Sequence, residues 1–100
     1  MKTESHGATL VITDIDRLSA TNATWFEELA GARLLDAHRT VDVDLSHARF
    51  IDSDGLEALI AVRSRLVGRQ GRVRLLSPAP MVKTLLKLLH LDRVFDIVNN

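Results

Sequence analysis

Short apolar runs mark three β-strands along the chain. Residues 8–15 are rich in β-branched and aliphatic side chains, and Gly7 before them predicts a turn that follows a short N-terminal strand. Residues 40–45 alternate strictly between polar and apolar side chains, which predicts a strand with one buried face. The segment Arg72-Val73-Arg74-Leu75-Leu76 predicts another strand, while residues 92–98 are compatible with either a strand or a short helix.

Apolar residues at helical spacing predict three helices between and after these strands. Ser19 or Thr21 is expected to cap the first helix. The second helix follows Gly55, and the third opens at Ser77 and Pro78. The stripes expected to face the core are Phe26, Leu29 and Ala30 in the first helix, Leu56, Leu59, Ile60, Leu66 and Val67 in the second, and Val82, Leu85, Leu86 and Leu89 in the third.

The order of these elements predicts an α/β fold. Most connections between successive strands are long enough to hold a helix, so the strands are expected to be mainly parallel, with right-handed crossovers. A chain of 100 residues forms one domain of ordinary size. We therefore expect a single domain over residues 1–100, with its core in residues 8–98 and a mainly parallel sheet of four to five strands with crossover helices.

The composition gives no indication of a nucleic-acid or membrane partner. Thirteen basic and thirteen acidic residues cancel, although the first fifty residues carry a net charge of −3 and the last fifty +3. A solvated helix face and the following turn explain the basic cluster more simply than a phosphate-binding patch does. Without an apolar leader or a membrane-length apolar run, we expect a cytoplasmic, bacterial-type protein that does not insert into membranes. The basic cluster consists of Arg63, Arg65, Arg69, Arg72 and Arg74.

The residue types needed for catalysis or metal binding do not come together in the sequence. The chain has no cysteine, and its histidines are not at metal-ligand spacing, so no metal or cofactor is expected. Asp42 and Asp44 share one face of their strand, and we expect them to flank a polar sheet edge or to cap neighbouring elements. No nucleophile–base pair can be assembled, so the chain is not expected to be an enzyme. The histidines, all expected to be exposed, are His6, His38, His47 and His90.

An apolar strand end runs into a polar turn, Asp52-Ser53-Asp54, which Gly55 and the second helix follow. Asp and Ser are favoured N-cap residues, so these side chains are expected to bond the free N–H groups of the helix. A purely structural interpretation is a cap built by Asp54 and Glu57, with Ser53 bonding an N–H two or three residues further on. The alternative is a switch, because a phosphate on Ser53 would lie at the positive end of a helix dipole.

Residues 41–66 resemble the STAS domain of bacterial anti-sigma factor antagonists. Their core is Val-Asp-Val-Asp-Leu-Ser-His-Ala-Arg-Phe-Ile-Asp-Ser-Asp-Gly-Leu, and that family places Asp-Ser-Ser-Gly-Leu between an apolar strand and a helix. The likeness continues from Arg74 into the last helix and covers most of residues 8–98. Asp54 stands in this chain where the family motif has its second serine.

The resemblance implies a regulatory protein that binds an anti-sigma factor of the serine-kinase type. Binding releases the sigma factor, and phosphorylation of the motif serine, here Ser53, reverses it. The contact surface is then expected to include the motif turn, the start of the following helix and the loop at residues 19–22. Its residues are Asp52, Ser53, Asp54, Gly55, Leu56, Ser19 and Asn22.

Two other functions fit the same sequence. Small STAS proteins also attach to the ATPase of ABC transporters for phospholipid, where the motif serine need not be phosphorylated. The chain could instead form a homodimer or a scaffold, because Met81, Leu85 and Leu88 make a second apolar stripe on the last helix. Burial in the core is the simpler explanation of that stripe.

Overall fold

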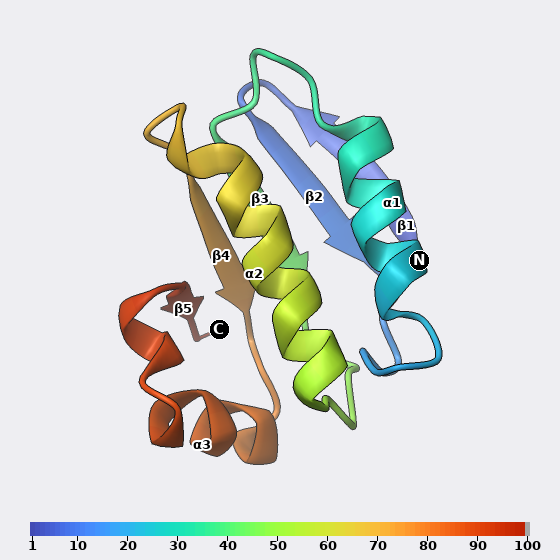
Figure 1. Ribbon diagram of the computed structural model, residues 1–100, viewed down its shortest axis with the longest axis vertical. Coiled ribbons are helices and arrows are strands. Elements are labelled where there is room, and N and C mark those ends of the chain that lie inside the picture. The colour runs from blue at the N-terminus through green and yellow to red at the C-terminus, as the bar shows by residue number, and fades with distance from the viewer. Residues whose placement is uncertain (100) are drawn as a thin grey trace.

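The computed structural model describes residues 1–99 and contains a five-stranded sheet with helices α1 and α2 against one face (Figure 1). Both of these helices begin at the same end of the molecule. The strands are β1 (Lys2–His6), β2 (Thr9–Thr13), β3 (Thr40–Asp44), β4 (Arg72–Leu76) and β5 (Asp96–Val98). The helices are α1 (Ala23–Arg33), α2 (Ser53–Val67), α3 (Pro80–Leu88) and the short 3₁₀ helix η1 (Leu91–Arg93).

Strand pairing confirms the expected topology. The strands lie in the order β1-β2-β3-β4-β5, and β1 and β2 form an antiparallel hairpin. This hairpin turns at Gly7, whose positive φ of 59° suits a residue without a Cβ atom. The pairs β2–β3, β3–β4 and β4–β5 are all parallel. The chain is therefore a single α/β domain, as the alternation of strands and helices predicted.

The core lies between the sheet and the helices. Phe26 of α1 and Leu59 of α2 pack into one cluster with alternate residues of the three inner strands. Burying an apolar side chain of this size stabilises the fold by about 1.5–3 kcal/mol relative to leaving it exposed. The fully buried strand residues are Leu10, Ile12, Val41, Val43, Val73 and Leu75.

The helices do not begin where the sequence pattern placed them. Asn22, rather than Ser19 or Thr21, is the N-cap residue of α1. Helix α2 begins at Ser53, ahead of the motif glycine. Helix α3 begins at Pro80, where proline suits the first position because an N–H there would have no partner within the helix.

The buried faces of α2 and α3 differ from the predicted stripes. In α2 the side chains of Ile60 and Val67 are exposed, and Val62 faces the core instead. Leu89 was expected to face the core from α3, but its side chain is exposed. The helix ends at Leu88, so Leu89 does not continue the helical stripe. The other predicted members of these two stripes are at least half-buried.

The second apolar stripe of α3 is not part of the core. Met81 and Leu88 are exposed, and Leu85 is only half-buried. Core burial, the simpler expectation for this stripe, is therefore wrong for two of its three residues. The helix packs with its other side, through Val82 and Leu86.

Two polar side chains that the sequence analysis placed at the surface are buried. His38 accepts a hydrogen bond at Nδ1 from the Leu35 N–H, at 2.9 Å, and its Nε2 lies 2.8 Å from Ser5 Oγ. Because Nδ1 is an acceptor, Nε2 carries the proton and donates to the hairpin. Asp42 lies on the central strand rather than at a sheet edge, and it pairs with Arg74 at 2.8 Å. The other three histidines are exposed, as expected.

The C-terminal segment combines the two structures that its sequence allowed. The 3₁₀ helix η1 ends at Arg93, and β5 then adds to the sheet beside β4. Phe95 lies between them and is buried. The segment therefore closes one side of the core.

Candidate functional site

Asp52 caps the N-terminus of α2 at the turn that the sequence analysis singled out. Its Oδ1 accepts a hydrogen bond from the Gly55 backbone N–H at 2.9 Å. Its Oδ2 accepts one from the Ala20 N–H at 3.1 Å, so the same carboxylate ties α2 to the loop before α1. Of the candidate cap residues in this turn, Asp52 therefore makes the side-chain cap, and the pair of Asp54 and Glu57 named in the purely structural interpretation does not.

The two backbone donors stabilise the ionised form of Asp52. The Gly55 N–H has the largest effect and the Ala20 N–H adds to it, so the pKa of the Asp52 carboxyl lies below its usual value of 3.8. The group is therefore charged at neutral pH. Hydrogen bonds to a charged acceptor are stronger than neutral ones, which makes this link between the two segments firm.

Gly55 allows the first turn of α2 to lie directly against the backbone of Leu18. A Cβ atom at this position would stand 2.1 Å from the Leu18 carbonyl oxygen, which no side chain can tolerate. Leu18 and Ile51 form an isolated parallel bridge at the same point, and the Leu18 N–H donates to the Phe50 carbonyl at 3.0 Å. The close approach of two backbone segments thus requires the glycine of the motif.

The side chain of Asn22 holds the loop before α1. Its Oδ1 accepts a hydrogen bond from the Ser19 N–H at 2.9 Å, and its Nδ2 donates to the Arg17 carbonyl at 2.8 Å. The Ser19 carbonyl accepts from the Ala23 N–H at 2.7 Å. The hydroxyl groups of Ser19 and Thr21 are 2.9 Å apart, within hydrogen-bond distance. These bonds fix the shape of the loop that Asp52 then attaches to α2.

Ser53 is the first residue of α2, and its side chain is exposed. Because Asp52 makes the cap hydrogen bond, the Ser53 hydroxyl is not needed to hold the start of the helix. It stands at the positive end of the helix dipole, where backbone N–H groups favour an added phosphate. The side chain of Asp54 is also exposed, and its negative charge opposes that preference.

The structure brings the predicted contact residues together but does not expose all of them. Ser53 and Asp54 are exposed, while Asp52 and Asn22 are half-buried. The remaining members shape the surface from beneath and do not offer their side chains to a partner. These buried members are Ser19, Gly55 and Leu56.

An acidic hollow beside this turn was not predicted. It measures about 330 Å³ and lies between the first turns of α1 and α2. In the sequence alone, Glu27, Asp54 and Glu57 each look like an ordinary charged residue on the solvent-exposed face of a helix. Only the packing of α1 against α2 brings the three side chains together. Its lining consists of Ala20, Ala23, Thr24, Glu27, Asp54 and Glu57.

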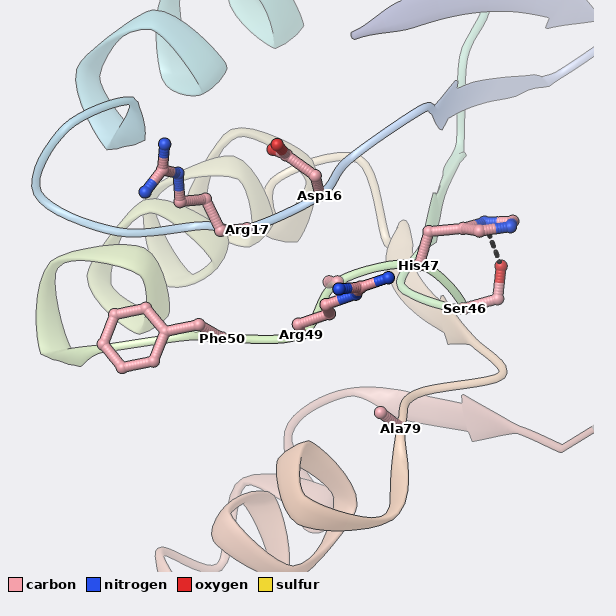
Figure 2. A pocket seen from close by; sticks show the side chains of 8 residues that line it. Asp16, Arg17, Ser46, His47, Arg49, Phe50 and Ala79 are labelled. Atoms are coloured by element: carbon pink, nitrogen blue, oxygen red, sulfur yellow. Dashed lines mark hydrogen bonds between the residues drawn. The ribbon is translucent and has the colours of Figure 1, made fainter.

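A larger hollow, of about 670 Å³, lies among the loops near the start of α3 (Figure 2). Figure 2 shows Arg17 and Arg49 on two different loops around it, with Ser46 next to His47. Ser46 Oγ lies 3.1 Å from His47 Nδ1. All of its charged side chains are exposed, which makes it an open feature of the surface rather than a preformed ligand pocket. Its lining residues are Asp16, Arg17, Ser46, His47, Ala48, Arg49, Phe50 and Ala79.

The described part of the chain holds neither a metal-binding cluster nor a membrane-spanning helix. Within residues 1–99, no group of three or more His, Asp or Glu side chains is placed to hold a metal ion. No helix in the same range combines the length and apolar character that a membrane crossing needs.

Comparison with known families identifies the fold. The family model of the STAS domain matches residues 1–100. The chain belongs to the STAS domain family. A comparison with curated protein sequences found no match. The resemblance drawn from the strand, the Asp-Ser-Asp-Gly-Leu turn and the following helix is thereby confirmed at the level of the family.

Solved structures, including those of anti-sigma factor antagonists, share this architecture over nearly the whole chain. The Thermotoga maritima protein TM1081 has a TM-score of 0.90 and 22% identity, covering 99% of this chain and 86% of that one. An anti-sigma factor antagonist from Mycobacterium paratuberculosis has a TM-score of 0.85 and 24% identity, covering 99% and 84%. The unphosphorylated form of Bacillus SpoIIAA, an anti-sigma factor antagonist, has a TM-score of 0.81 and 21% identity, covering 99% and 88%. At these identities the likeness establishes the fold.

Proposed function

We propose that this STAS domain is a regulatory protein of the anti-sigma factor antagonist type. It binds an anti-sigma factor of the serine-kinase type through the start of α2 and the loop at residues 19–22. Phosphorylation of Ser53 then abolishes that binding. The structural neighbours among anti-sigma factor antagonists support the general class. The position of Ser53 in the family motif supports its role as the modified residue.

The observation that carries the proposal is that capping and exposure fall on different residues: Asp52 caps α2, whereas the side chain of Ser53 is exposed. Asp52 holds the helix start through its hydrogen bond from the Gly55 N–H, and it binds the loop before α1 through the Ala20 N–H. The neighbouring Ser53 hydroxyl is exposed and can therefore be modified without loss of the cap. A phosphate adds about −1.5 to −2 charges, so modification changes the surface while the fold remains.

The added charge would join a surface that is already acidic. Glu27, Asp54 and Glu57 line the hollow between α1 and α2, which lies beside the turn. A partner surface that fits the neutral hydroxyl of Ser53 would have to desolvate a doubly charged group, which is strongly unfavourable without new cationic contacts. The helix N-terminus stabilises part of this negative charge within the chain. The phosphate is therefore expected to weaken partner binding more than it weakens the fold.

Incubation with ATP and the anti-sigma serine kinase of the same organism tests the modification. The wild-type chain is expected to take up one phosphate, placed on Ser53 by peptide mass spectrometry, and Ser53→Ala to take up none. Ser64→Ala is the matched control, because Ser64 is another exposed serine of α2, whose hydroxyl donates to the Ile60 carbonyl. Equal labelling of Ser53→Ala and wild type, or no labelling of either, would remove the switch.

Binding to the same kinase tests the consequence. Ser53→Ala is expected to bind like the unmodified chain, and Ser53→Asp or the phosphorylated chain to bind at least about tenfold more weakly. Co-purification with the ATPase of a phospholipid ABC transporter, together with no affinity for the kinase, would replace the proposed role with that of a transporter subunit.

A further inference from the structure

The arginines of the basic cluster do not all have the same surroundings in the structure. Arg72 and Arg74 lie on β4, and each forms an ion pair with an aspartate of a neighbouring strand. Arg65 lies in the last turn of α2 and Arg69 in the turn that follows the helix. Within residues 1–99, no carboxylate pairs with either of these two. Their charges are therefore available to an anion from outside the chain.

Arg39, from the loop before β3, meets Arg69 at the end of the molecule opposite the start of α2 (Figure 1). Nη1 of Arg69 donates to the carbonyl oxygens of Leu35 and His38, at 2.7 and 3.2 Å. Nη1 of Arg39 donates to those of Asp36 and His38, at 2.6 and 3.2 Å. Because both nitrogens bond the same His38 oxygen, they are held within roughly 6 Å of each other.

The carbonyl group that the two arginines share is fixed in place. His38 is fully buried, and both of its ring nitrogens have hydrogen-bond partners. The two backbone segments also touch directly, since a Cβ atom at Gly71 would stand 2.4 Å from the Arg39 carbonyl oxygen. The Arg72 N–H donates to that same oxygen at 2.9 Å. Side chains anchored on such a rigid base lose little conformational freedom when they bind a ligand.

Arg65 adds a third cation, four residues before Arg69. A Cβ atom on Gly31 would lie only 3.0 Å from Arg65 Nη2, so the glycine leaves room on α1 for this guanidinium group. Leu35 follows Gly31 by four residues, so the contacts of Arg65 and Arg69 with α1 and its following loop lie about one helical turn apart. None of the arginine side-chain hydrogen bonds within residues 1–99 comes from Arg65.

The negative charges at this end do not balance the cations Arg39, Arg65 and Arg69. The C-termini of α1 and α2 both lie here, and each carries about half a negative charge. Asp36 adds one more, although its carboxylate makes no ion pair in the described part of the chain. A surplus of about one positive charge therefore remains. Arg33, the last residue of α1, increases it further.

We propose that Arg39 and Arg69 bind a phosphate group, with Arg65 beside it. Each of the first two guanidinium groups uses Nη1 for the backbone and leaves Nε and Nη2 without a partner among the described residues. A tetrahedral oxyanion can accept hydrogen bonds from two guanidinium groups through different oxygens, whereas a planar carboxylate pairs best with one. Ser53 lies at the other end of α2, roughly 20 Å away, so this inference does not depend on the proposed function.

A nucleic acid fits this arrangement less well than a single phosphate group does. The phosphates of a nucleic acid follow one another along a strand, and many cations bind them in a row. Here the three cations lie close together, and the chain as a whole carries no net charge. The ligand is therefore a phosphate group that is either free in solution or part of the headgroup of an anionic lipid.

Titration of the isotope-labelled full chain with inorganic phosphate, followed by NMR at constant pH and ionic strength, tests the site. The backbone amides of residues 35–39 and 69–72 are expected to shift to saturation, while chloride leaves them in place. Arg65→Ala is expected to weaken phosphate binding about fivefold or more. This variant should keep its fold, which circular dichroism checks, because Arg65 is exposed.

Arg63→Ala is the matched control for Arg65→Ala. Arg63 belongs to the same helix, and a separation of two residues places it on nearly the opposite side. It is therefore expected to bind phosphate like wild type. Equal losses in these two variants, or shifts of the wild type that grow with phosphate without saturating, would show a general effect of charge and overturn the site.

Arg69→Lys separates geometry from charge. The variant keeps the positive charge but loses the planar guanidinium group, so phosphate binding is expected to weaken although the net charge is unchanged. Binding equal to that of wild type would contradict the proposed contact. If this variant fails to fold, Arg65→Ala still decides the question, because its side chain supports no other part of the described structure through a hydrogen bond.

Vesicles distinguish the two sources of the phosphate group. Binding to phosphatidylglycerol vesicles that Arg65→Ala and inorganic phosphate both reduce would assign the site to a lipid headgroup. Saturation by inorganic phosphate without any vesicle binding would assign it to the free anion. Vesicle binding without a saturable phosphate shift would overturn the proposal. Ser53→Ala should bind phosphate like wild type, so the result stands whether or not the kinase binds.

Discussion

Asp42 on β3 and Arg74 on β4 lie directly opposite each other in the parallel register and form a two-point ion pair. Arg74 Nε is 2.8 Å from Asp42 Oδ1, and Arg74 Nη2 is 3.0 Å from Oδ2. Hydrogen bonding to Asp42, together with its negative charge, raises the pKa of Arg74. Strand alternation puts the pair on the sheet face opposite the apolar core. Strands β3 and β4 are therefore joined by a polar contact as well as by their buried side chains.

Removal of the Asp42 carboxylate is expected to destabilise the domain by about 1–3 kcal/mol, the usual cost of losing hydrogen bonds to a charged group. Asp42→Ala measured by urea denaturation checks this value. Arg72→Ala is the control, because the Arg72–Asp96 pair at 3.3 Å is exposed and such pairs contribute less than about 1 kcal/mol. Equal losses for the two variants would show that burial of Asp42 adds nothing to its pair.

Acid is expected to remove the contribution of Asp52 to stability. Because the pKa of its carboxyl is lower in the folded chain than the ordinary 3.8, this contribution is complete well above that pH. It is lost as the pH falls through the lower, folded-state pKa. Urea denaturation of wild type and Asp52→Asn should therefore show a stability gap that is constant near neutral pH and closes in acid. A gap that stays the same at all pH values would mean that the ionised carboxylate is not the stabilising form.

Gly55→Ala is expected to destabilise the fold by about 1–3 kcal/mol, since a side chain forced into a packed site displaces its surroundings. The added methyl group would collide with the carbonyl oxygen of Leu18, a backbone atom that cannot rotate away. Gly68→Ala serves as the control, because a Cβ atom there meets nothing within 4 Å and the residue has a negative φ of −66°. This control is expected to be neutral or slightly stabilising in thermal denaturation. Similar effects of the two substitutions would contradict the close contact at Leu18.

Asp54→Asn is expected to speed phosphorylation of Ser53 by roughly fivefold in dilute buffer. The Asp54 side chain is exposed beside Ser53, and like charges a few ångströms apart in water repel by about 1 kcal/mol. Initial rates with labelled ATP and the anti-sigma kinase measure the change. The gain should shrink at high salt, because exposed charges are screened. An unchanged rate would show that Asp54 does not hinder the reaction.

The sequence predicted helices and strands well where a short-range pattern or a single residue with a strong backbone preference determines the local structure. Strict alternation in residues 40–45 identified β3 and its buried face, since side chains of a strand alternate between two sides. The turn at Gly7 was found because only glycine adopts that backbone angle freely. Three neighbouring cap residues, in contrast, left the cap of α2 undecided, because each can bond the same N–H groups. Ala20, which is 32 residues away, gives Asp52 its second hydrogen bond.

Burial of polar and apolar side chains was predicted less well, because it depends on which elements meet. His38 was expected at the surface and is buried, since the β1 hairpin and the loop before β3 supply a partner for each ring nitrogen. Met81 and Leu88 were expected in the core and are exposed, since α3 packs with another side. Helical spacing identifies an apolar face but not the surface that covers it.

By itself, the sequence determined the order of the elements, the mainly parallel sheet and the position of the Asp-Ser-Asp-Gly-Leu turn at the start of a helix. These follow from backbone preferences and side-chain periodicity, which act over a few residues. Only the tertiary structure decided that Asp52 makes the cap, that Ser53 is exposed while Ser19 and Leu56 are buried, and that α3 turns an apolar stripe outward. Those outcomes depend on contacts between segments that are distant along the chain, and the packing of the whole domain selects them.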